Sequence, residues 1–133
     1  MAQARGRRVF PGRPDQVRVA RSFVLGVLDT QSPFRDTAGL LVSEAATNAI
    51  LHSSSGRDGA TFEVGYALGT GQLRVEVRDQ GSSTGPRRRV HEPESLTGRG
   101  LELFDLLSTR WGVTEHSAGR TVWFELGGLP SAS

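Results

Sequence analysis

The chain has 133 residues, a formal net charge of +2, 36% hydrophobic residues and no cysteine. The lack of cysteine excludes disulfides, thiolate zinc sites and cysteine nucleophiles, and no apolar run reaches the ~20 residues of a membrane span. Because the N-terminal segment has charge but no apolar stretch behind it, it is not a secretory signal, and we expect one soluble cytoplasmic domain with no membrane contact.

The first half of the sequence predicts a strand and two helices. Residues 1–8 are expected to be a flexible arm, followed by a short edge strand at 8–10 that Pro11 ends. Asp15 is expected to cap a helix that runs to about residue 30, with apolar side chains at helical spacing. Residues 34–52 predict a second helix, which is apolar over more than half of its circumference and therefore buried.

The second half predicts two hairpins around a loop and a helix. Strands at 61–68 and 72–79 are joined by a glycine-rich turn, and the second alternates apolar and charged residues. The polar stretch 80–97 indicates a lid, a binding loop or disorder. Gly100 opens a third helix with Leu101, Phe104 and Leu106 or Leu107 inward. A closing hairpin pairs 111–115 with 121–126, and residues 127–133 form a flexible tail.

This order of elements predicts the class of the fold. Helices cluster in the chain, and strands come in hairpins rather than in strand–helix–strand units. The expected fold is therefore α+β, a two-layer sandwich with helices packed on one face of a mostly antiparallel mixed sheet.

All 16 basic residues are arginine, a bias that is typical of GC-rich genomes. The two basic clusters, at 5–13 and 87–89, lie in Gly/Pro-flanked segments without interleaved aromatic residues, so we expect no direct binding of nucleic acid. Without lysine the chain cannot form a Walker A loop or the catalytic core of a eukaryotic-type protein kinase. Any nucleotide chemistry must use another fold.

Three patterns carry candidate chemistry. Glu44, Asn48 and His52 share one face of the second predicted helix, although such a stripe is also typical of a solvated helix edge. Asp79 ends an apolar strand two residues before Gly81, which suits an acceptor for a ligand amino group or an ordinary turn. Glycines 98 and 100 flank a helix start, where main-chain N–H groups favour anions such as phosphates.

Taken together and in order, these patterns resemble the histidine-kinase-like ATPase superfamily, and within it the bacterial anti-sigma serine/threonine kinases. Segment 43–52 resembles the N box of that family, and segments 77–81 and 97–101 resemble its two glycine boxes. Segment 119–124 resembles the strand that closes the adenine pocket. The resemblance implies the Bergerat ATP-binding fold over residues 9–126.

The resemblance also implies a role for each matching residue. Asn48 would bind Mg²⁺ through its amide oxygen, and Glu44 would be the general base. Asp79 would accept a hydrogen bond from the adenine amino group of ATP, supported by Thr121. The remaining nucleotide-binding residues would be Gly81, Gly98, Arg99, Gly100 and Leu101.

The function implied is that of a regulatory anti-sigma factor that binds a sigma factor and phosphorylates an anti-anti-sigma partner of the STAS type, acting as a dimer. Two alternatives stay open. ATP could drive a partner-binding switch without phosphate transfer, or the motifs could be coincidental in an unrelated α+β domain.

Overall fold

The computed structural model describes residues 2–51, 59–79, 99–117 and 119–128. The elements in chain order are β1 (Ala2–Pro11), α1 (Gln16–Leu25), α2 (Arg35–Leu51), β2 (Thr61–Gly69), β3 (Gln72–Asp79), α4 (Arg99–Leu107), β4 (Arg110–His116) and β5 (Gly119–Gly127). The five strands form one sheet in the order β1-β2-β3-β5-β4, and all four ladders are antiparallel.

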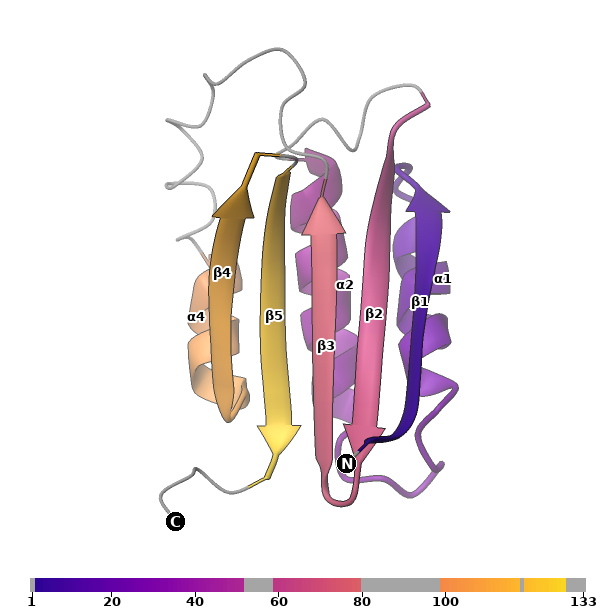
Figure 1. The fold of residues 1–133 in the computed structure, drawn as a ribbon, viewed down its shortest axis with the longest axis vertical. Helices are drawn as coiled ribbons and strands as arrows, with labels where there is room; N and C mark the ends of the chain where they lie inside the picture. The colour runs from indigo at the N-terminus through magenta and orange to yellow at the C-terminus, as the bar shows by residue number, and fades with distance from the viewer. Residues whose placement is uncertain (1, 52–58, 80–98, 118, 129–133) are drawn as a thin grey trace.

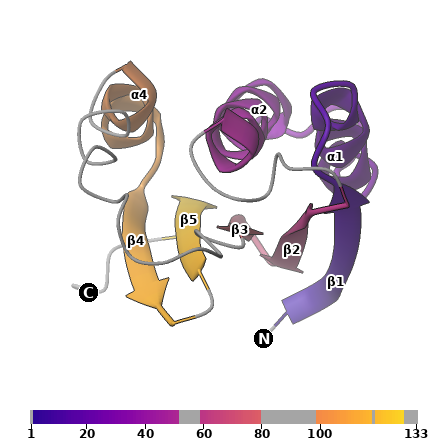
Figure 2. The ribbon, with the colours of Figure 1, turned by 90° about the horizontal axis from the view of Figure 1, so that it is seen from above.

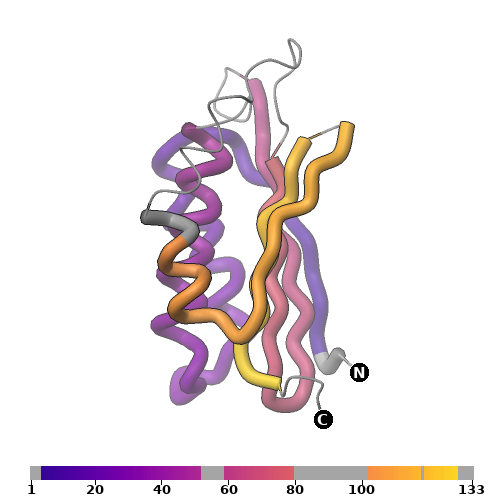
Figure 3. The backbone as a smooth tube through the Cα atoms, turned by 90° about the vertical axis from the view of Figure 1, so that its left-hand side faces the viewer, coloured from indigo at the N-terminus to yellow at the C-terminus, as the bar shows by residue number. Residues whose placement is uncertain are grey.

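The helices of the described chain lie in one layer against one face of this sheet. Figure 1 and Figure 2 show α2 over the middle of the sheet, with α1 beside β1 and β2 and with α4 beside β4. The side view in Figure 3 separates the helical layer from the strands. The predicted α+β sandwich is confirmed.

The core lies between the two layers because the strands alternate with a period of two. In β3, Leu73, Val75 and Val77 are buried, as predicted, and their neighbours point to the other face. Helix α2 is buried along most of its length, which explains its apolar composition. Its buried residues are Ala38, Gly39, Leu41, Val42, Ala45, Ala46, Ala49 and Ile50.

The opposite face of the sheet, which we call the open face, carries a network of ion pairs between strands. The arginines of the network are 36% to 59% exposed, so they lie across the pleat and remain partly in contact with water. The closest atoms lie 3.4 Å apart in Arg7–Glu76, 2.8 Å in Arg74–Glu125 and 2.8 Å in Arg110–Glu125, and the Arg74 guanidinium lies 4.3 Å from the Trp123 ring centroid.

The prediction of a flexible arm at residues 1–8 is wrong, because β1 begins at Ala2 and pairs with the whole of β2. Arg7 crosses the β2 strand at Gly65, where a Cβ atom would lie only 3.0 Å from the arginine Nη1. It reaches Glu63 at 3.8 Å and Glu76 at 3.4 Å. A small residue opposite a long one thus allows a Gly/Arg-rich segment to pair.

Helix α1 differs from the prediction at both ends. Asp15 precedes the helix, but its side chain makes no capping hydrogen bond. Its Oδ1 accepts from Arg13 Nε at 3.2 Å instead. The helix ends at Leu25 and not near residue 30. The carbonyl groups of Leu25 and Leu28 accept hydrogen bonds from Arg35 Nη1 at 3.1 and 3.2 Å, which satisfies the end of the helix.

The inward face predicted for the third helix is partly correct. Phe104 is fully buried and packs edge-on against Phe124 with the ring centroids 5.8 Å apart. Leu106 and Leu107 are 76% and 39% exposed, so they do not contribute to the core as expected. Among the side chains of α4 that the structure describes, Phe104 is the one that is deeply buried. The loop predicted at 80–97 lies outside the described residues.

Candidate nucleotide site

Two of the predicted site residues lie on the second half of α2. Glu44 and Asn48 are one helical turn apart, and both are partly buried. Ala45, Ala46 and Ala49 beside them are packed into the core, which fixes this part of the helix against the sheet. Within the described ranges, neither the Glu44 carboxylate nor the Asn48 amide forms a hydrogen bond or ion pair. His52 lies outside those ranges.

Asp79 ends β3 on the helix-covered face of the sheet and is only 4% exposed. Its cross-strand partner on β5 is Arg120. The main-chain N–H of Arg120 donates to Asp79 Oδ1 at 3.2 Å, and Arg120 Nε lies 3.4 Å from Asp79 Oδ2. A buried carboxylate needs such compensation, because transfer of an unpaired charge from water is costly.

Three of these elements share one end of the molecule. In Figure 1 the last turn of α2, the arrowhead of β3 and the start of β5 lie toward the upper end, and α4 begins lower down, beside β4. Arg99, Gly100 and Leu101 are the first three residues of α4, so the predicted helix start is confirmed. Gly81 and Gly98 lie outside the described residues, and their expected contacts with phosphates remain predictions.

The structure does not bring Thr121 to this group. Thr121 pairs with Arg78 on the open face of the sheet, and its Oγ1 lies 3.2 Å from His116 Nε2. The residue that faces Asp79 is Arg120, which the sequence analysis did not select. The alternation in β5 could have predicted this position. Val122, Phe124 and Leu126 are buried against the helices, and residue 120 lies on the same face of the strand.

The set of metal ligands at Asn48 suits an ion that is held mainly by phosphates. The described parts of the chain contain no group of three or more His, Cys, Asp or Glu side chains that could hold a metal. Asn48 offers one amide oxygen, a hard ligand. Mg²⁺ is typically held by one or two protein oxygens together with substrate phosphates and water, so Asn48 fits that ion.

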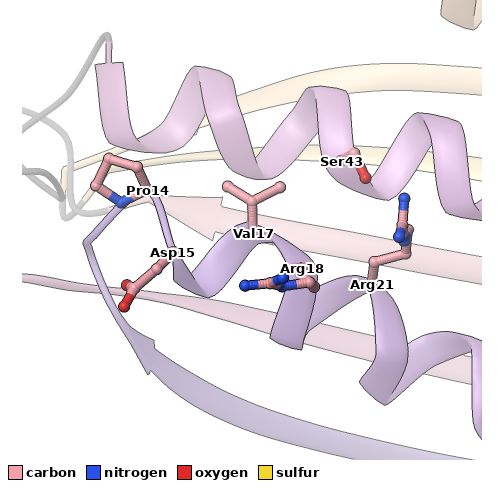
Figure 4. A pocket seen from close by; sticks show the side chains of 6 residues that line it. All are labelled: Pro14, Asp15, Val17, Arg18, Arg21 and Ser43. Carbon is pink, nitrogen blue, oxygen red and sulfur yellow. The ribbon is translucent and has the colours of Figure 1, made fainter.

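A separate open groove of about 320 Å³ lies between α1 and α2. Figure 4 shows Arg18 and Arg21 of α1 on one wall and Ser43 of α2 on the other, with Asp15 at one end. None of the predicted site residues lines it. The groove is therefore lined by residues other than Glu44, Asn48 and Asp79.

No helix among the described residues is long and apolar enough to cross a membrane.

The fold and one comparison define a class of protein. Helices packed on one face of an antiparallel sheet are consistent with the fold of the histidine kinase-like ATPase domain, and residues 10–126 match the model of that family. The chain belongs to this family of ATPase domains.

The chain is also similar to two serine-protein kinases. It is 28% identical over 127 residues to the serine-protein kinase RsbW of Bacillus pumilus, and this alignment covers 85% of this chain and 78% of that protein. It is 27% identical over 106 residues to the serine-protein kinase RsbW of Oceanobacillus iheyensis, covering 71% of this chain and 67% of that protein.

Proposed function

We propose that this chain binds ATP with Mg²⁺ and transfers the γ-phosphate to a serine or threonine of a partner protein. The observation that carries the proposal is a pair of residues on α2. Glu44 and Asn48 lie one turn apart, and their side chains form no hydrogen bond or ion pair within the described ranges. The family membership and the two serine-protein kinase relatives support the same assignment.

The roles divide between the two residues. Asn48 would hold Mg²⁺, which neutralises phosphate charge when it is bound. The partner hydroxyl attacks the γ-phosphorus, a new P–O bond forms, and the bond to the β-phosphate oxygen breaks to release ADP. Glu44 accepts the proton that the hydroxyl loses, as a general base one turn from the metal ligand. Asp79 accepts a hydrogen bond from the adenine amino group.

The partners would be those that the resemblance implies, a sigma factor and an anti-anti-sigma protein of the STAS type. The chain would then be an anti-sigma factor that acts as a dimer and releases the sigma factor when it binds the anti-anti-sigma protein. Phosphorylation of the anti-anti-sigma protein would allow the chain to bind the sigma factor again.

The test uses Glu44→Gln. Glutamine keeps the size and hydrogen bonding of the side chain but cannot act as a base, so we expect unchanged ATP affinity and a rate of phosphate transfer lower by about 10²- to 10⁴-fold. ATP binding is measured by titration calorimetry. Transfer is measured with γ-labelled ATP and a purified STAS-type protein from the same genome, with slow ATP hydrolysis as a second readout.

Glu63→Gln is the matched control, because Glu63 lies on the open face of the sheet and its ion pair with Arg7 is long, 3.8 Å. It should leave both binding and transfer unchanged. If the wild-type protein binds ATP but neither transfers phosphate nor hydrolyses ATP, the protein is a nucleotide-dependent switch without phosphotransfer. If Glu44→Gln abolishes ATP binding, Glu44 is not the general base.

A further inference from the structure

Arg120 holds the carboxylate of Asp79 from the neighbouring strand. The two residues are directly paired in the β3–β5 ladder. The main-chain N–H of Arg120 contacts Oδ1 at 3.2 Å, and its guanidinium Nε lies 3.4 Å from Oδ2. Both oxygens of the carboxylate are therefore contacted by one residue, which restricts rotation of the Asp79 side chain.

This ion pair is much less exposed than the others in the sheet. The Arg120 and Asp79 side chains are 11% and 5% exposed, whereas the arginine in each of the open-face pairs is 36% to 59% exposed. Arg120 Nε is buried and is not aligned for a hydrogen bond. Burial of a guanidinium carries a large desolvation cost, and a buried ion pair is on average a poor source of stability. Its position at the end of the central strand calls for another explanation.

We propose that Arg120 is a positioning and specificity residue for adenine, acting through Asp79. The inference rests on the proposed ATP-binding function. Arginine stays protonated at any relevant pH, and its two contacts hold the Asp79 carboxylate in a fixed orientation. A carboxylate has about four acceptor positions, so contact with Arg120 is compatible with a further bond from the 6-amino group of adenine. The carbonyl group of guanine at that place would face the carboxylate and be repelled.

The experiment compares ATP with purine riboside 5′-triphosphate, which lacks the 6-amino group. The ratio of the two dissociation constants isolates the contact between the amino group and Asp79, because the sugar and phosphates are the same. A hydrogen bond to a charged group predicts that the wild-type protein prefers ATP by about 10- to 100-fold. In Arg120→Gln, which removes the charge but keeps polarity, we expect the preference to fall to about threefold or less.

Two further variants separate positioning from a general loss of charge or of structure. Arg120→Lys keeps the positive charge and should keep the preference within about threefold of the wild type. Arg78→Met removes a charge from the residue next to Asp79, but Arg78 is exposed on the open face, so the preference should not change. Thermal melting checks that each variant is folded. If Arg120→Gln does not fold, Arg120→Met is measured in its place, and an unchanged preference in that folded variant overturns the proposal.

The other outcomes are also decisive. An unchanged preference in folded Arg120→Gln overturns the proposal, as does tighter ATP binding, which would make Arg120 a plug that the nucleotide displaces. A wild-type protein that binds both nucleotides equally refutes the contact between Asp79 and adenine but leaves ATP binding intact. A wild-type protein that binds neither nucleotide refutes the proposed function itself.

Discussion

Glu125 on β5 offers a test of the two-faced arrangement of the sheet. Its side chain is only 8% exposed on the open face. Oε1 accepts hydrogen bonds from Arg110 Nε at 3.0 Å and Nη2 at 2.8 Å, and Oε2 accepts from Arg74 Nη1 at 2.8 Å. Burial raises the pKa of the Glu125 carboxyl, but the hydrogen bonds and positive charges of Arg110 and Arg74 outweigh it, and the net pKa is lowered.

Glu125→Gln keeps the shape of the side chain and removes its charge. Each hydrogen bond to a charged group contributes about 1.5–3 kcal/mol, but the simple sum overstates the loss here. The Arg110 and Arg74 side chains are 59% and 36% exposed and can regain water. We therefore expect the variant to lose about 1–3 kcal/mol of unfolding free energy at pH 7.

The pH dependence follows from the direction of the pKa shift. The folded pKa of Glu125 lies below the unfolded value of about 4.3. The charge therefore contributes its full stability above the unfolded pKa, and that contribution is lost as pH falls through the lowered folded pKa. The difference between wild type and Glu125→Gln should be constant from about pH 5 to 8 and should shrink below about pH 4.

Urea unfolding followed by circular dichroism at several pH values measures this difference. Glu63→Gln is again the control, because Glu63 is more exposed and its ion pair is longer, so its effect should be below about 1 kcal/mol. Because Glu125 lies on the face away from Asp79, the ATP affinity of the folded variant should be unchanged. A stability difference that is equal at pH 3 and pH 7, or an altered ATP affinity, would refute this reasoning.

Two further predictions concern the proposed metal ligand and a turn. Asn48→Ala should weaken ATP binding in the presence of Mg²⁺ by at least roughly 10- to 100-fold, which is the loss typical for outer-shell partners of metals. With EDTA, calorimetry should give the same ATP affinity for the variant and the wild type. Equal affinities in Mg²⁺ would exclude Asn48 as a ligand. Gly71 and Gly127 have φ angles of 70° and 74°, but only at Gly127 would a Cβ atom overlap the Gly71 carbonyl oxygen and the Phe34 ring. Gly71→Ala should therefore cost about 1–2 kcal/mol of stability and Gly127→Ala about 1–3 kcal/mol more; equal melting temperatures for the two variants would contradict this.

Elements that carry their own pattern were predictable from the sequence. The alternation of β3 and the apolar composition of α2 reflect burial that each segment experiences along its whole length. Only the end of β1, at residues 8–10, was predicted, because residues 2–8 are rich in arginine and glycine, and their strand conformation depends on the backbone of β2, more than fifty residues away in the chain. Local composition cannot report a pairing of that kind.

The candidate site divides in the same way. Glu44, Asn48 and Asp79 follow from motif spacing, and the structure places the first two on α2 and the third at the end of β3. Thr121 was chosen for its residue type within a motif, whereas the face that a strand residue occupies is set by register. The register of β5 against β3 brings Arg120 to Asp79 and turns Thr121 to the open face.

The strand order has a consequence for when the site comes into existence. β5 is the last of the described strands, yet it lies beside β3, and Asp79 and Arg120 are 41 positions apart in the chain. A ribosome delivers the helix with Glu44 and Asn48, and then Asp79, before the strand that compensates the buried carboxylate. Closure of that long loop is also among the slower steps expected in folding. The proposed adenine pocket thus forms only after β5 has paired with β3, and a bound nucleotide would stabilise the sheet that contains β5 over intermediates that lack it.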